Sequence, residues 1–130
     1  MKRKVLIVDD SRPMLALLSG MLKMNYEITS KTSAVAALET LKEGYLPDLI
    51  ITDINMPVMD GFDFITGLKA NSALAGIPIM VLSGLQTSAD RLKLYKLGID
   101  DYISKPFNPE EMCIRVEKLM YNVMVKVSVN

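Results

Sequence analysis

The sequence predicts an α/β fold, in which one doubly wound, five-stranded parallel sheet carries five helices on its two faces. Short apolar runs alternate with helix-length amphipathic stretches along almost all of the chain. The runs are nearly continuous in Val, Ile and Leu, which is typical of parallel strands that are buried on both faces. A length of 130 residues suits one domain with a substantial core.

Five apolar runs have the length and composition of strands. They cover 5–8, 26–30, 48–52, 77–82 and 101–104. The second run is the most polar and gives the weakest strand signal. Because crossovers between parallel strands are right-handed, the alternation leads to a doubly wound topology, and we predict the flavodoxin-like strand order 2-1-3-4-5.

The helices are recognised mainly by the residues at their ends. They are expected over 11–22, 33–42, 62–70, 88–97 and from 109 onward. Ser11 and Asn108 are suited to cap the first and the last helix, and Pro13 and Pro109 occupy first-turn positions. Gly98 follows the fourth helix and predicts its end.

The last eight residues carry a different pattern, because four valines alternate with other side chains over 123–130. A period of two with β-branched residues is typical of a strand. The segment can be the end of the last helix or the start of a strand that pairs outside the domain. We therefore expect a domain over 1–122 and a C-terminal tail or the start of a linker over 123–130.

Composition narrows the functional classes. Fifteen basic residues balance fifteen acidic ones, which argues against direct binding of nucleic acid by this domain. The chain has no histidine, so His-based catalysis and His metal ligands are excluded. Cys113 is the only cysteine, and no apolar stretch has membrane-spanning or signal-peptide character. We expect a cytoplasmic protein that does not contact membranes.

Polar side chains follow four of the five predicted strands. Asp9 and Asp10 follow the first strand, Asp53 the third, Ser83 the fourth and Lys105 the fifth. The carboxyl ends of parallel strands meet at one edge of the sheet, where ligands bind in such folds. These five side chains are therefore expected to lie close together. Individually they also fit helix caps, turns or solvated loops.

Three carboxylates at one edge repel one another by roughly 4 kcal/mol per pair at about 4 Å. Lys105 supplies one positive charge, and oxygen ligands of this kind suit Mg²⁺ as a further source. A magnesium site that keeps positions for phosphate is suited to phosphoryl transfer, with a carboxylate as the nucleophile. The expected cofactor is therefore Mg²⁺.

The motifs around these residues resemble the receiver domain of bacterial response regulators in two-component signal transduction, of the chemotaxis-regulator type. The resemblance covers about residues 3 to 121. It rests on four segments that occur in the family's order: 8–10, 52–57 with 59–61, 82–84 and 100–107. Each segment is weak by itself, and the specificity comes from finding all four in order at the predicted strand ends.

The resemblance implies a phosphorylation switch. Asp53 would accept a phosphoryl group from a sensor histidine kinase or a phosphotransfer protein. Asp10, Asp53 and the backbone carbonyl of Asn55 would bind Mg²⁺, and Asp9 would do so directly or through water. Lys105 would pair with Asp53 and then with the phosphoryl group. The domain would be no enzyme beyond self-catalysed phosphorylation and dephosphorylation.

The resemblance also implies which side chains change position on phosphorylation. Ser83 would turn toward the phosphoryl group and Tyr102 would change its rotamer with it, altering the surface of the fourth helix, fifth strand and last helix. The Lys105–Pro106 peptide bond would be cis. Leu85 stands where many relatives have a polar residue, so we expect a long-lived phosphoryl group.

Two alternative functions and a possible homodimer remain open. A docking module that no longer uses phosphorylation would keep the same fold. An aspartyl-phosphate phosphatase is disfavoured, because Asn55 stands where a general acid is needed. A charged set resembles that of receivers that form homodimers through the fourth helix, fifth strand and last helix: Arg91, Asp100, Asp101, Glu111 and Arg115.

Overall fold

The computed structural model describes residues 2–84 and 86–129, with the backbone alone for 126–129. Five strands form one parallel sheet: β1 (Arg3–Val8), β2 (Tyr26–Lys31), β3 (Leu49–Thr52), β4 (Ile79–Ser83) and β5 (Asp101–Ser104). Their order is β2-β1-β3-β4-β5, so the predicted fold and strand order are confirmed. The helices are α1 (Arg12–Leu22), α2 (Ala34–Lys42), α3 (Gly61–Ala70), α4 (Ser88–Leu97) and α5 (Pro109–Val129).

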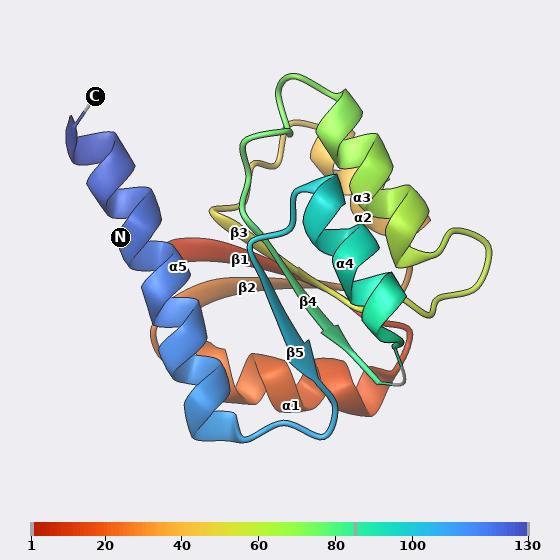
Figure 1. Ribbon diagram of the computed structural model, residues 1–130. Coiled ribbons are helices and arrows are strands. Elements are labelled where there is room, and N and C mark those ends of the chain that lie inside the picture. The colour runs from red at the N-terminus through yellow and green to blue at the C-terminus, as the bar shows by residue number, and fades with distance from the viewer. Residues whose placement is uncertain (1, 85, 130) are drawn as a thin grey trace.

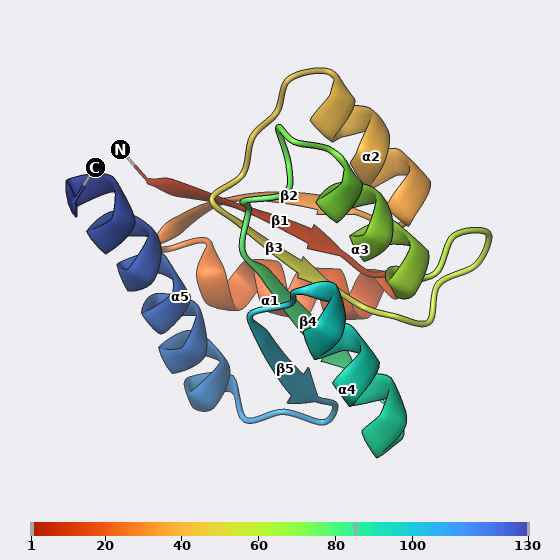
Figure 2. The same ribbon diagram turned by 45° about the horizontal axis from the view of Figure 1, so that its top comes forward.

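The sheet is the middle of three layers (Figure 1). Helices α1 and α5 cover one face, and α2, α3 and α4 cover the other, as the turned view in Figure 2 also shows. Successive side chains of β1 alternate between the layers: Val5 and Ile7 pack with α1 and α5, whereas Leu6 and Val8 pack with α2 and α3. Burial on both faces explains the continuous apolar strands of the sequence.

Two strand starts differ from the prediction by two residues, and three other strand boundaries differ by one. Strand β1 begins at Arg3, because its polar first residues pair in register with β2 from Tyr26 onward. Strand β4 begins at Ile79, two residues later than predicted, after Pro78, which has no N–H for a ladder bond. The Pro78 carbonyl still accepts a hydrogen bond from the backbone N–H of Ile50, so the sheet stays continuous there.

Helix α5 extends through the valine-rich segment. Met112, Val116 and Met120 are buried at four-residue spacing against the sheet, and the helix continues to Val129. The interpretation of this segment as a strand is therefore wrong for the residues described. Once the packed first half has nucleated the helix, each further residue adds a backbone bond at little cost, even where the side chains are β-branched. Asn130 lies outside the described residues.

Helix α4 has few contacts with the core. Leu94 is its one buried side chain, and most of its other residues are polar or exposed. Thr87 and Asp90 form a capping box at its start, and Gly98 ends it with a φ of 104°. Local end signals therefore define this helix more than burial does. None of the described helices combines the length and apolar composition needed to cross a membrane.

Candidate phosphoacceptor and metal site

The backbone of the sheet brings the first and third strand ends together. Val8 is in register with Thr52. One residue further, the Asp53 N–H donates to the Val8 carbonyl at 2.9 Å, and the Asp9 N–H donates to the Lys31 carbonyl at 3.1 Å. Both aspartates are thus fixed by main-chain bonds that continue the strand ladders. Their position follows from strand pairing and not from side-chain chemistry.

An acidic cluster results, which consists of Asp9, Asp10 and Asp53. One carboxylate oxygen from each residue lies within 4.8 Å of the other two. Asp9 and Asp53 are buried, with 2% and 8% of their surfaces exposed, whereas Asp10 faces solvent. The cluster is therefore open on one side, where a small ligand can approach.

Lys105 is the positive partner of this cluster. Its Nζ lies 2.8 Å from Asp9 Oδ2 and 3.5 Å from Asp53 Oδ2. The resemblance implied pairing with Asp53, and the structure adds a shorter contact with Asp9. Burial lowers the pKa of the Lys105 ammonium, but its bond to Asp9 and the charges of Asp53 and Asp9 outweigh this and leave the pKa raised. The lysine is therefore charged at neutral pH.

The donor set fits a hard divalent cation. Three carboxylates share one positive side chain among the described residues, and Asp10 has no ion pair among them. Oxygen ligands with one solvent-facing side suit Mg²⁺, which keeps several waters when it binds. Asn55 directly follows Ile54 in the β3–α3 loop and is exposed. Its carbonyl remains a predicted ligand.

The chain around Asp53 is tightly arranged. The Ile54 N–H donates to Asp53 Oδ1 at 2.7 Å, which fixes the carboxylate orientation and leaves Oδ2 facing Lys105. Gly61 approaches so closely that a Cβ there would lie 2.6 Å from the Asp53 carbonyl oxygen. Glycine is thus required at the start of α3 by space. Nothing in the sequence alone shows how close this approach is.

The β3–α3 loop holds one strained residue. Val58 has a φ of 70°, a left-handed conformation that costs β-branched side chains more than most. Its side chain is 99% exposed, so no packing in the domain compensates for the conformation. No sequence signal marked this residue, because nothing in a Pro-Val-Met run specifies a positive φ.

The other side of the site is formed by the β4–α4 connection, of which Ser83, Gly84, Gln86 and Thr87 are described. Ser83 is fully buried at the end of β4, and its backbone carbonyl accepts a bond from the Lys105 N–H at 2.8 Å. The Ser83 hydroxyl accepts a hydrogen bond from Gln86 Nε2 at 3.4 Å. No sequence signal identified Gln86, since its contact with Ser83 depends on side-chain conformation.

Tyr102 lies on β5 with only 8% of its surface exposed. Its ring packs in the core on the α2–α3–α4 face, and the Arg91 guanidinium lies 6.0 Å from the ring centroid. Burial raises the pKa of its hydroxyl, which hydrogen bonding to Ser104 and the charge of Arg91 partly offset. The Lys105–Pro106 bond that follows β5 is cis, as predicted.

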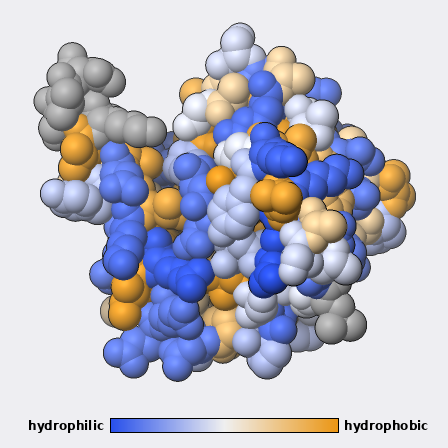
Figure 3. All heavy atoms as spheres, in the orientation of Figure 1, coloured by the Kyte–Doolittle hydropathy of each residue, from blue (hydrophilic) through white to orange (hydrophobic). Residues whose placement is uncertain are grey.

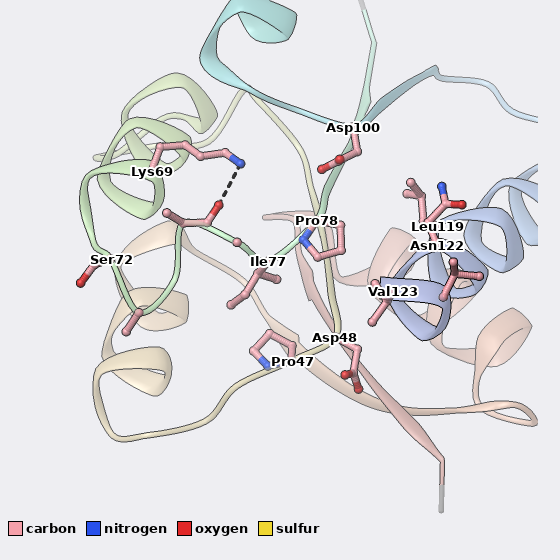
Figure 4. A pocket seen from close by; sticks show the side chains of 14 residues that line it. Pro47, Asp48, Lys69, Ser72, Ile77, Pro78, Asp100, Leu119, Asn122 and Val123 are labelled. Atoms are coloured by element: carbon pink, nitrogen blue, oxygen red, sulfur yellow. Dashed lines mark hydrogen bonds between the residues drawn. The ribbon is translucent and has the colours of Figure 1, made fainter. Parts of the chain in front are cut away.

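A groove at the opposite end of the sheet is a different kind of feature (Figure 4). It has a volume of about 770 Å³ and lies between the end of α5 and the amino ends of the strands. Its charged groups already have partners: Asp48 accepts from the Lys4 N–H, Asp100 accepts from the Ile79 N–H, and Lys69 donates to the Ala75 carbonyl. These bonds anchor strand and helix ends. The charged side chains of the groove therefore have structural roles, and they indicate no catalytic or ligand-binding site.

Comparison with known proteins agrees with this geometry. The family model of the response regulator receiver domain matches residues 5–117, and the chain belongs to that family. The chain is 37% identical to the transcriptional regulatory protein PrrA of Mycobacterium tuberculosis over 90% of its length and 49% of that protein. It is 32% identical to a histidine kinase of Formosa agariphila over 95% of its length and 9% of that protein.

A solved structure gives the same result. The chemotaxis protein CheY4 of Vibrio cholerae is 30% identical, with a TM-score of 0.85 over 92% of this chain and 99% of that one. The chain therefore spans nearly all of a chemotaxis protein but about half, or less, of the curated relatives named above. It is a receiver domain of two-component signalling, a class of signalling domain.

Proposed function

We propose that this domain is a phosphorylation switch in which Asp53 accepts a phosphoryl group, with Mg²⁺ and Lys105, from a sensor histidine kinase or a phosphotransfer protein. The observation that carries the proposal is the position of the Asp53 carboxylate. It lies in the acidic cluster, 3.5 Å from the Lys105 ammonium, with one of its oxygens within 4.8 Å of an oxygen of the solvent-facing Asp10.

The chain's own groups have distinct tasks in this reaction. An Asp53 carboxylate oxygen forms a bond to phosphorus as the bond between phosphorus and the donor's leaving group breaks. Lys105 stabilises the negative charge on the phosphoryl oxygens, because a charge-assisted hydrogen bond is about twice as strong as a neutral one. The Ser83 hydroxyl donates a hydrogen bond to another phosphoryl oxygen. Water later attacks phosphorus and releases inorganic phosphate.

The metal has a defined place in the proposal. Asp10, Asp53 and the Asn55 carbonyl would hold Mg²⁺, with Asp9 as a direct or water-mediated ligand. Bound there, Mg²⁺ supplies positive charge that offsets the crowded carboxylates and the incoming phosphoryl group. Asp9 is less available than Asp10, because its two oxygens already accept from Lys105 and from the Ser11 N–H.

The test is incubation with acetyl phosphate and Mg²⁺, followed by intact mass measurement. We expect the mass of one phosphoryl group to be added, and the adduct to disappear when Mg²⁺ is chelated beforehand. Asp53→Ala should abolish the adduct. Asp63→Ala is the matched control, because Asp63 is an exposed aspartate in the first turn of α3, and it should leave the adduct intact.

The same experiment separates the alternatives. A docking module without phosphorylation would gain no mass under any condition, and a phosphatase would release phosphate from unrelated phosphoesters with many turnovers. An adduct that persists in Asp53→Ala would place the acceptor elsewhere and contradict the proposal. Leu85 lies outside the described residues, so the expected long lifetime of the adduct depends on its apolar character alone.

The output surface in this proposal is α4, β5 and α5. Figure 3 views this side and shows mainly hydrophilic residues with separate apolar patches. Arg115 is held within the domain by Asp101 at 3.1 Å and Glu111 at 2.8 Å. The proposed homodimer would exchange these bonds for equivalent ones across the interface. Sedimentation of the beryllofluoride-treated protein should then show dimers that Arg115→Ala prevents.

The cellular setting belongs to the proposal as well. A cytoplasmic location follows from the chemistry of the proposed kinase reaction and from the single cysteine of the chain. We assign residues 1–122 to the receiver and 123–130 to a tail or the start of a linker, although α5 is continuous across that boundary. The balanced charge gives no support to direct nucleic acid binding by this domain.

A further inference from the structure

The side chain of Gln86 contacts the site, and the proposed reaction does not use it. Gln86 lies three residues beyond Ser83 and immediately before Thr87, which caps α4. Its Nε2 donates to Ser83 Oγ at 3.4 Å and so connects the end of β4 to the start of α4 through side chains. The following steps rest on the proposed function, in which the Ser83 hydroxyl must reach a phosphoryl group on Asp53.

The position of Ser83 limits how it can move. Its main chain is fixed by the β4–β5 ladder, where Ser83 is in register with Ser104, and by the bond from the Lys105 N–H. The residue is fully buried, so water does not hydrogen-bond freely with its hydroxyl. Movement of the hydroxyl therefore means a change of the Ser83 rotamer, with the backbone staying in the sheet.

The hydroxyl is engaged with Gln86 in the present arrangement. Among the described residues, Ser83 Oγ has its hydrogen bond with Gln86 and none with Asp53 or Lys105. A buried hydroxyl without a partner costs free energy, so the bond from Gln86 stabilises this rotamer. Turning toward a phosphoryl group exchanges that neutral bond for a charge-assisted one.

The bond is also connected to α4. Gln86 adjoins the capping box of Thr87 and Asp90. Releasing the hydrogen bond between Gln86 and Ser83 therefore frees the first turn of α4, which buries only Leu94. We infer that Gln86 is a positioning residue that holds Ser83 in its resting rotamer and restrains the start of α4, so that it opposes activation. At 3.4 Å the bond is long, which suits a contact that must be released.

The test compares wild type with Gln86→Leu, which keeps a side chain of similar bulk, one bond shorter, and removes the amide. The measurement is the apparent dissociation constant for beryllofluoride with Mg²⁺, followed by NMR amide shifts. We expect binding about two- to tenfold tighter in Gln86→Leu, since a side-chain hydrogen bond of this kind shifts an equilibrium by that factor. The phosphorylation rate with acetyl phosphate should rise in parallel.

A double-mutant cycle distinguishes a bond to Ser83 from a general effect on the loop. In a Ser83→Ala background the Gln86→Leu change should leave beryllofluoride affinity unaltered, because the partner hydroxyl is gone. Lys96→Leu is the matched control, since it adds the same leucine to α4 at an exposed position away from Ser83. It should bind beryllofluoride as wild type does, with an unchanged melting temperature.

The outcomes separate this inference from the proposed function. Equal affinity of wild type and Gln86→Leu, or the same gain in the Ser83→Ala background, would overturn the role of Gln86 and leave the switch proposal intact. A wild-type protein that binds no beryllofluoride and takes no phosphoryl group would overturn the proposed function, and the inference with it. A gain confined to proteins that retain Ser83 supports the inference.

Discussion

Helices α1 and α4 both border the site, and they are held in different ways. Helix α1 has 11 residues and buries Leu15, Leu18 and Leu22 against the sheet. Helix α4 has 10 residues and buries Leu94 alone. Ser11 caps the start of α1, whereas α4 has a capping box of Thr87 and Asp90 and a left-handed Gly98 at its end. Helix α4 therefore has the stronger end signals and the smaller burial.

This contrast assigns different roles to the two sides of the site. The acidic cluster lies next to α1, where strand ladders and apolar packing fix Asp9 and Asp53. The Ser83–Gln86 contact lies next to α4, where few buried side chains oppose movement. Segments with little buried apolar contact open at low free energy. The firmly packed side can thus hold the reacting groups while the weakly packed side changes.

The largest expected effect is on global stability. Leu18→Ala removes a buried side chain of α1 and should lower the free energy of unfolding by about 2–5 kcal/mol. Leu92→Ala removes an exposed leucine of α4 and should change it by about 0.5 kcal/mol or less. Urea denaturation of both variants measures the difference. Similar losses in the two variants would show that α4 is as firmly packed as α1.

Amide hydrogen exchange should sharpen the comparison without any mutation. In the protein alone, we expect amides in α4 to exchange at least about tenfold faster than those in α1. Local opening of α4 exposes less buried apolar surface and therefore costs less free energy. Treatment with beryllofluoride and Mg²⁺ should change exchange rates in α4 and at Ser83, with α1 little affected. Uniform changes across both helices would contradict the division of roles.

The β3–α3 loop lies between the two sides and stores strain at Val58. Val58→Gly should stabilise the domain by about 0.5–1 kcal/mol, because relief of the left-handed conformation outweighs the extra freedom of glycine in the unfolded chain. Thermal unfolding at neutral pH measures this. Gly67→Ala should also stabilise the domain, but by a different cause. Gly67 lies inside helix α3 with open space around it, and alanine favours the helix there.

The smallest expected effect is a pH dependence through Tyr102 on β5. Burial raises the pKa of Tyr102, so the unfolded chain ionises at about pH 10, before the folded one does. This stabilisation is complete below that pH and is lost as the pH rises through the folded value. Unfolding free energies above pH 10 should therefore fall less steeply in Tyr102→Phe. The exposed Tyr121→Phe should show the wild-type slope.

Much of the fold and of the acidic cluster could be predicted, because the relevant rules are local or topological. Apolar strands, capping residues and glycine stops define the elements of this chain. Parallel pairing then brings every strand's carboxyl end to one edge. Asp53 and Lys105 are 52 residues apart, yet their meeting needed no detail beyond strand order. The valine-rich end stayed open between a helix end and a strand, because its two-residue period and the preceding helix predict different structures; the structure shows the helix.

By itself, the sequence determined the alternation of strands and helices, the strand-end positions of Asp9, Asp10, Asp53, Ser83 and Lys105, and the balance of charge. The strand order was chosen by analogy with flavodoxin-like folds, and the structure confirmed it. Only the tertiary structure decided the finer contacts. Lys105 lies nearer Asp9 than Asp53, Gln86 reaches back to Ser83, and Val58 takes a positive φ. These depend on side-chain rotamers and loop dihedrals, which are set by the surrounding packing and leave no period or motif in the chain.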